Sequence, residues 1–320
     1  MLEETNVIEL NYELPRFTRL ISSYLADFFI FLFLSILLIV PGVFILEAIP
    51  NFQNVLNTRN QKLVDSKLYI KKDKLIRLDT FYKEDTNLTY NEKSEELNLR
   101  LTYFFTTFIN NDLENKGLET YNNIKSKGNF EGDKLFDENF NRVLINSDYD
   151  ETYFNFYLDA YNTALGYLQV NKSYVENRNN VIFGYVLTII LASSVSFITL
   201  FLIIPLIFNR GKKTLGMLFT HLSLINIRAF SVSNKCFCLR FLFQFFVMFL
   251  VSLFSFLIPI LISIGFLIFS KRRQTLTNYI FNTYIVYNEN QIVYLNLKEY
   301  QIKNKKLEEN FIDNKLDLKL

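Results

Sequence analysis

The sequence predicts a mainly α-helical protein that crosses a membrane several times and carries a mostly helical domain between its first two spans. Two observations support this fold class. Three long runs lack any charged residue: 28–46, 179–209 and 241–270. A polar segment, 52–178, separates the first run from the second. Because a helix needs about 20 apolar residues to cross a bilayer, each run is long enough to span.

Composition narrows the functional class. Lys and Arg total 34 against 32 Asp and Glu, so a net charge of +2 argues against a polybasic nucleic-acid binder. Two cysteines argue against a disulfide scaffold, and a single histidine argues against a His-rich metal site. We therefore expect no nucleic acid, no metal and no cofactor among its ligands.

The flanks of the first two runs define the expected spans. Residues 1–19 are polar and acidic and lack the basic start of a signal peptide, so 20–49 is predicted as an uncleaved transmembrane helix. The second span is predicted at 180–208. Basic residues precede the first span and follow the second, which places residues 1–19 and the loop 209–240 in the cytoplasm. The insert 52–178 then lies outside the cytoplasm, in a multi-pass protein of the cell membrane.

The third run, 241–270, permits two topologies. A single helix of this length would span about 45 Å and place the basic cluster Lys271–Arg273 outside. A hairpin broken near Ser255 and Pro259 would keep both basic ends inside, and we favour it. The chain therefore has three or four spans, or two spans plus a helical hairpin. The remaining segment, 271–320, is predicted as a cytoplasmic tail. Within it, the alternation around Asn288–Asn290 predicts a β-hairpin of 283–287 with 291–297.

The insert 52–178 shows helical periodicity in two places. Apolar side chains recur at helical spacing over 97–108 and over 154–168, which predicts two helices packed around a core or forming a groove for a partner. Segments 67–70 and 75–78 are predicted as short strands or as a continuation of the first helix, and 111–148 as loop. The insert contains no His or Cys and no spaced calcium-loop pattern, so we expect no enzyme activity.

Asp27 is the ionisable residue that the membrane prediction makes most notable. It lies about 12 Å into a helix counted from Arg19, a depth at which charged groups are costly and face protein or water. Arg19, Ser23 and Asp27 are spaced by four residues and form one polar stripe. The stripe predicts either part of an ion or solute path or a structural hydrogen-bond site.

Four segments together resemble the RDD family of membrane proteins. The opening segment 15–27 carries Arg19 and Asp27 at the family's spacing. Residues 211–216, followed by 222–226, look like the family's Gly-x-Thr-x-Gly-Lys motif and trailing strand. Arg240 occupies the place of the Arg that opens the family's next helix. Residues 273–286 resemble the family's closing segment. The motif positions that carry the resemblance are Gly211, Thr214, Gly216, Arg240 and Arg273.

The chain departs from the RDD pattern at three positions. Asn278 stands where the family has its second Asp, Thr277 where it usually has His, and Met217 where it has Lys. The resemblance covers about 16–50 and 180–287 and leaves out the insert. It implies a polar intramembrane site of Arg19, Asp27 and Asn278, with transport of unidentified ligands as the suggested family role, and sodium–proton exchange for some members.

Two functions follow as expectations. The first is transport of a small ion or solute, with Asp27 as the polar site and Arg19 as its charge partner. Because three or four spans are too few to enclose a path, transport would require a homo-oligomer. The second is a non-transporting anchor or assembly protein in the lipid bilayer that presents the 52–178 domain to a protein partner. A membrane-embedded enzyme is the weakest alternative, because no nucleophile, base or metal set is visible.

Overall fold

The computed structural model describes residues 12–128, 134–143, 146–289 and 291–305. The chain divides into two compact units, each with its own core. Unit 1 comprises Met1–Gly42 and Ile189–Leu320, and unit 2 comprises Val43–Thr188. The protein is mainly helical, as expected. Among the described residues, three helices are long and apolar enough to cross a membrane: Phe17–Ala48, Lys172–Ile207 and Asn234–Phe254.

The first two of these helices connect the units in sequence. Helix α1 (Phe17–Ala48) is a single helix of 32 residues, about 48 Å long, with Pro41 inside it. The second is built from α7 (Lys172–Ile198), a π-helical stretch η3 (Thr199–Ile203) and α8 (Ile204–Ile207). Helix α1 ends at Ala48 and α8 ends at Ile207, close to the predicted span ends at 49 and 208.

The 241–270 run forms two helices rather than one. The first is continuous through α10 (Asn234–Phe243), π-helical η4 (Gln244–Val251) and α11 (Ser252–Phe254), and Ser233 caps its start by accepting a hydrogen bond from Cys236 N. The second is α12 (Ile258–Phe269). Phe256 and Leu257 break the helix between them with left-handed φ values of 50° and 65°. This break lies between the two residues at which the hairpin interpretation placed it.

A two-stranded antiparallel sheet joins two distant loops of unit 1. Strand β3 (Leu222–Asn226) pairs with β4 (Thr283–Tyr287), and Leu224 lies opposite Ile285. A short helix precedes each strand: α9 (Leu215–Phe219) and α13 (Leu276–Ile280). The predicted hairpin of 283–287 with 291–297 is therefore wrong. Strand β4 takes its partner from the 209–240 loop, and 291–297 forms no strand among its described residues.

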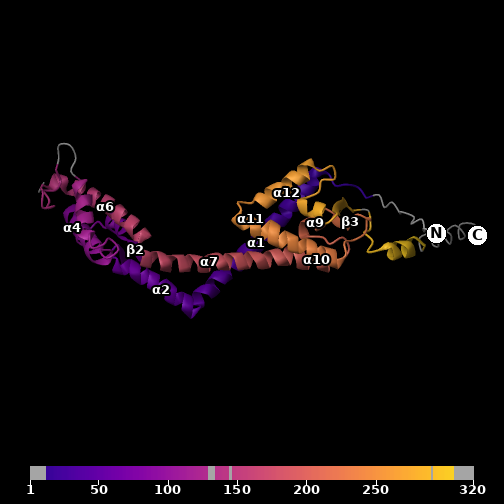
Figure 1. Cartoon of the computed structure of the whole chain (residues 1–320), viewed down its shortest axis with the longest axis horizontal. Helices are drawn as coiled ribbons and strands as arrows, with labels where there is room; N and C mark the ends of the chain where they lie inside the picture. Colours follow the sequence, from indigo (N-terminus) through magenta and orange to yellow (C-terminus); the bar gives the residue numbers. More distant parts are fainter. Residues whose placement is uncertain (1–11, 129–133, 144–145, 290, 306–320) are drawn as a thin grey trace, which may run out of the picture. The chain divides into compact units, whose positions relative to one another are not determined.

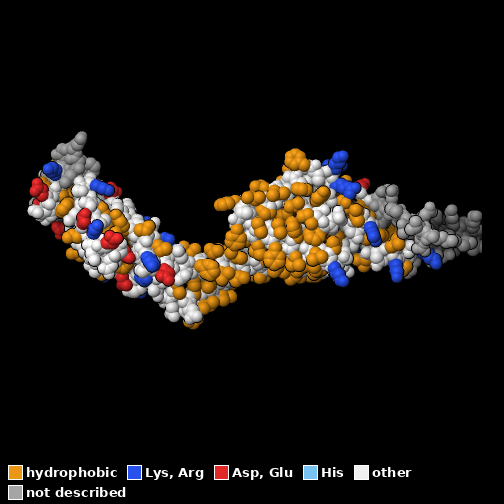
Figure 2. All heavy atoms as spheres, in the orientation of Figure 1, with side chains coloured by type: hydrophobic (Ala, Val, Ile, Leu, Met, Phe, Trp, Pro, Cys, Tyr) orange, Lys and Arg blue, Asp and Glu red, His pale blue; other side chains and the backbone are white. Residues whose placement is uncertain are grey.

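Unit 1 has an aromatic cluster among its helices and a small aliphatic core beside its sheet. Phe197 contacts ring faces or edges from α1 and from the α10–η4 helix, including Phe31 and Phe249. Leu20, Met217 and Leu224 are buried with Ile285 beside the sheet. In Figure 2, apolar side chains cover the visible face of the helices of unit 1, and Lys and Arg side chains gather at the end that carries the loops. This distribution matches a membrane-facing surface with a basic margin.

Unit 2 is a helical domain with one small hairpin. Two of its helices, α4 (Tyr90–Tyr103) and α6 (Asp150–Val170), pack side by side (Figure 1). A capping box between Thr89 and Glu92 begins α4. The remaining elements are α2 (Pro50–Asp65), β1 (Tyr69–Lys71), β2 (Leu75–Arg77), α3 (Leu78–Glu84), π-helical η1 (Phe104–Phe108), α5 (Gly117–Ser126) and the 3-10 helix η2 (Ser147–Tyr149).

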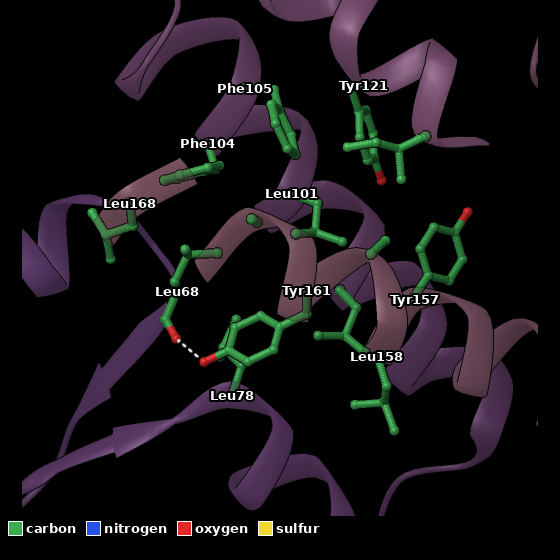
Figure 3. Packing of buried hydrophobic residues seen from close by; sticks show 14 of the residues in the cluster. Leu68, Leu78, Leu101, Phe104, Phe105, Tyr121, Tyr157, Leu158, Tyr161 and Leu168 are labelled. Carbon is green, nitrogen blue, oxygen red and sulfur yellow. Dashed lines mark hydrogen bonds between the residues drawn. The ribbon is translucent and has the colours of Figure 1, made fainter. Parts of the chain in front are cut away.

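The core of unit 2 is made of the predicted periodic side chains. Figure 3 shows Phe104 beside Leu168, Phe105 beside Tyr121, and Leu101 next to Tyr161. Tyr161 is fully buried, and its hydroxyl donates a 3.0 Å hydrogen bond to Leu68 O. Both helices predicted from periodicity exist, and 69–71 and 75–77 pair as strands. The assignment of all of 111–148 to loop was wrong, because 117–126 forms α5, whose Tyr121 and Ile124 complete the core.

Candidate functional site

Asp27 lies buried in unit 1, where both of its carboxylate oxygens accept hydrogen bonds from the chain itself. Only 3% of the residue is exposed. Thr214 Oγ1 donates to Oδ2 at 2.6 Å, and the backbone N–H of Gly216 donates to Oδ1 at 2.7 Å. Both donors belong to the start of α9. Asp27 therefore fastens α1 to the short helix that leads into β3.

Thr214 and Gly216 suit this contact for separate reasons. Thr214 is the N-cap of α9 and also accepts a hydrogen bond from Met217 N, so its hydroxyl serves the helix and Asp27 together. Gly216 permits the close approach of α9 to α1. A Cβ at this position would lie 2.2 Å from Ser23 O and 2.8 Å from Asp27 Cγ. The family-motif spacing thus has a direct packing reason here.

A second polar contact joins α10 to α13. The Arg240 guanidinium is buried, and its Nη2 and Nε donate to Asn278 Oδ1 at 2.9 and 3.2 Å. Its Nη1 donates to Gln244 Oε1 at 3.2 Å, and Thr283 Oγ1 donates to Asn278 Oδ1 at 3.2 Å. Among the described residues no carboxylate lies within ion-pairing distance of Arg240. Its charge is therefore matched only by neutral amide oxygens.

The predicted triad of Arg19, Asp27 and Asn278 does not form one contact group. Arg19 lies over the Tyr287 ring, 4.0 Å from its centroid, and forms no ion pair with Asp27. Asp27 binds α9, and Asn278 binds Arg240. The expected role of Arg19 as charge partner is thus not what the structure shows. The four-residue spacing of Arg19, Ser23 and Asp27 gave no signal that α9 would supply the carboxylate's partners.

The remaining motif positions lie in the loops beside the sheet. Gly211 has a φ of 79° and donates its N–H to Ser231 Oγ at 3.2 Å. Arg273 donates through Nη1 to Pro15 O at 2.8 Å. Lys212, which lies next to Gly211, was not predicted as a site residue. It is 2% exposed, donates to Asn209 and Asn234 side chains, and burial lowers its pKa.

Two buried polar atoms near these contacts have no hydrogen-bond partner among the described residues. They are Ser23 Oγ, one helical turn before Asp27, and Asn278 Nδ2. The same part of the chain contains no group of three or more His, Cys, Asp or Glu side chains that could hold a metal ion. The arrangement is consequently a set of hydrogen-bonded helix contacts that contains one carboxylate and one guanidinium, without a nucleophile paired to a base.

Comparison of the chain with protein families, with curated proteins and with solved structures found no match. The resemblance to the RDD family therefore stays a prediction carried by the motif residues.

Proposed function

We propose that this chain is a multi-pass membrane protein of the RDD type that acts as an anchor and presents unit 2 to a protein partner outside the cytoplasm. The observation that carries the proposal is the state of Asp27. Its two oxygens already accept hydrogen bonds from Thr214 and Gly216, so the carboxylate links α1 to α9. A transported cation would have to share both oxygens with these two donors.

The organisation of unit 2 supports the same role. Its core contains fully buried aromatic side chains from α4, α5 and α6, including Phe105, Tyr121 and Tyr161. A core of this kind stabilises a domain without help from a lipid-facing surface. The outer face of unit 2 in Figure 2 shows acidic and basic side chains interspersed, as on a water-exposed domain. Such a domain is a plausible carrier of binding specificity for a protein ligand.

The test compares two variants of the full chain in native membranes. A photoreactive residue at exposed Leu99 or Val170 of the full chain should form a crosslinked complex with the partner. A chain in which a short Gly-Ser linker replaces 52–178 should no longer co-purify with that same partner. Asp27→Asn should keep the complex, because Asn retains an acceptor for Gly216 N. Loss of the complex in Asp27→Asn with unit 2 intact and folded would contradict the anchor role.

Transport of a small cation is the second candidate, and one observation favours it. Ser23 Oγ is buried without a partner one turn from Asp27, so a hydroxyl and a carboxylate lie together on one face of α1. Buried ionisable groups in spans commonly mark ion or proton paths. Sodium–proton and potassium–proton exchange in proteoliposomes tests this candidate. Flux that disappears in Asp27→Asn at equal incorporation would favour transport, and absence of flux in the unmodified chain would favour the anchor.

A further inference from the structure

Two segments of unit 1 follow the same backbone course. Each starts with a basic residue in the left-handed region, continues with a threonine N-cap and a five-residue helix, passes a second left-handed residue and ends in a five-residue strand. The paired positions are Lys212 and Arg273, Thr214 and Thr275, α9 and α13, His221 and Asn282, and β3 and β4. Every pair is separated by 61 residues.

The long helices before these segments correspond in the same way. Helices α1 and α10 begin at Phe17 and Asn234, which are 217 residues apart. A backbone hydrogen bond is accepted just before each helix, and the two acceptor residues are also 217 residues apart. Tyr287 N donates to Glu13 O at 3.0 Å, and Asn226 N donates to Phe230 O at 2.8 Å. Unit 1 therefore contains two modules, which we define as 12–42 with 189–226 and as 230–287.

The equivalent residues Lys212 and Arg273 each contact the region where the other module's first helix begins. Lys212 of the first module donates to Asn234 Oδ1 at the start of the second module's first helix. Arg273 of the second module donates to Pro15 O just before the start of the first module's first helix. Strands β3 and β4 pair antiparallel with Leu224 opposite Ile285 at the centre. The strand pair is symmetric about this centre, whereas the acceptors of Lys212 and Arg273 differ by two positions, because Pro15 corresponds to Val232 and not to Asn234.

The modules differ at the turn between their two long helices. In the first module, the chain between α1 and α7 forms most of unit 2. In the second module, the same place is occupied only by residues 255–257. The side chains around this short turn are apolar and exposed: Phe254 at 76%, Phe256 at 94% and Leu257 at 54%. No charged residue occurs between Arg240 and Lys271.

We infer that the second module is a re-entrant hairpin whose tip, Phe254–Ile258, lies among lipid acyl chains. Its two ends lie on the membrane side that holds β3 and β4. The backbone of the tip is suited to lipid, because the N–H groups of Ser255, Leu257 and Ile258 donate to Val251, Ser252 and Ser255 carbonyls. Helix α12 has 12 residues and a length of about 18 Å, which is shorter than the hydrocarbon core of about 30 Å. The other arm, Asn234–Phe254, is long enough to cross, but only its uncharged part 241–254, about 21 Å long, follows the buried Arg240.

A lipid occupant accounts for the tip better than a protein partner. Basic residues flank the hairpin at both ends, Arg240 before it and Lys271 and Arg272 after it, as expected for ends at the cytoplasmic margin. The exposed side chains at the tip are aromatic or aliphatic with no charged neighbour to give specificity to a protein contact. This inference does not depend on the presentation role of unit 2 and would hold if unit 2 bound nothing.

The test uses the full chain in vesicles after Cys236 and Cys238 are replaced by serine. A spin label at Phe256→Cys should collide with dissolved oxygen severalfold more often than with an aqueous nickel chelate. The matched control, Leu99→Cys on an exposed surface of unit 2, should show the opposite preference. Impermeant maleimide should label Arg228→Cys and Lys271→Cys from the same side of the membrane.

Two results would overturn the inference. One is preferential collision of the label at position 256 with the aqueous chelate, which would place the tip in water or in a hydrophilic contact. The other is labelling of positions 228 and 271 from opposite sides of the membrane, which would mean that the segment from α10 to α12 crosses the membrane instead of returning to the same side. If the spin label disturbs insertion, the reactivity of Phe254→Cys, whose side chain is exposed, toward aqueous maleimides gives the same distinction: little reaction is expected in lipid, and rapid reaction would place the tip in water.

Discussion

The backbone N–H of Gly216 donates a 2.7 Å hydrogen bond to Asp27 Oδ1, and the same glycine leaves room for the Ser23 carbonyl. A single residue thus satisfies one oxygen of a buried carboxylate and permits the close approach of α1 and α9. The contact joins the first helix of the chain to a loop that lies more than half the sequence away.

Gly216→Ala should destabilise unit 1 by about 1–3 kcal/mol, because its Cβ would meet Ser23 O at 2.2 Å and force the helices apart. The melting temperature of the detergent-solubilised chain measures the effect. Gly265→Ala is the matched control. Gly265 lies in α12 with no atom within 4 Å of a built Cβ, so the change should be neutral or slightly stabilising. Equal melting temperatures for the two variants would contradict the close contact.

Asn278→Asp should stabilise unit 1 by about 1 kcal/mol. The change replaces the partnerless Nδ2 by an oxygen and gives the buried Arg240 guanidinium a charged acceptor. Asn278→Leu should cost about 3 kcal/mol or more, because it leaves a buried charge without its main acceptor. Thermal unfolding of both variants at equal detergent concentration makes the comparison. A loss of stability in Asn278→Asp similar to that of Asn278→Leu would show that the site cannot hold a carboxylate.

Unit 2 should lose stability above pH 10. Burial raises the pKa of Tyr121, Tyr157 and Tyr161 above the ordinary value of 10.0. The folded unit therefore keeps protons that the unfolded chain releases at that pH, and the free energy of unfolding falls as pH rises. Limited proteolysis of unit 2 between pH 8 and pH 11 follows the loss.

Tyr161→Phe provides the control for this pH dependence. It should cost about 1 kcal/mol at neutral pH through loss of the hydrogen bond to Leu68 O, yet its stability should fall less steeply above pH 10. An unchanged slope would mean that Tyr161 does not contribute to the alkaline transition.

Gly117→Ala should destabilise unit 2 and leave the membrane helices inserted. A Cβ at this position would lie 1.9 Å from the Phe105 carbonyl oxygen, so α5 would have to move away from η1. Gly166→Ala, in α6 with open space around it, should be neutral or should stabilise by up to about 1 kcal/mol. Protease resistance of unit 2 in membranes distinguishes the two. Equal resistance would indicate that α5 is not packed as described.

Most of the long helices can be predicted from local sequence features. In a bilayer, the backbone N–H and C=O groups of a long uncharged run such as 28–46 can form their hydrogen bonds within a helix. The periodic apolar side chains of 97–108 and of 154–168 each indicate one buried helix face. The motif residues of the family resemblance also pointed to Asp27 and Thr214, although not to their contact. These features depend on composition and local spacing, so they can be read along the chain.

The contacts between distant segments depend on tertiary packing and could not be predicted from local features. Strand β4 pairs with β3 instead of 291–297, because a strand's partner depends on long-range packing that local alternation does not encode. Asp27 accepts from α9 rather than pairing with Arg19, since the close approach at Gly216 brings two donors to it. The correspondence of Lys212 with Arg273 became visible only through their backbone conformation and exchanged contacts, because the two segments share few residue identities.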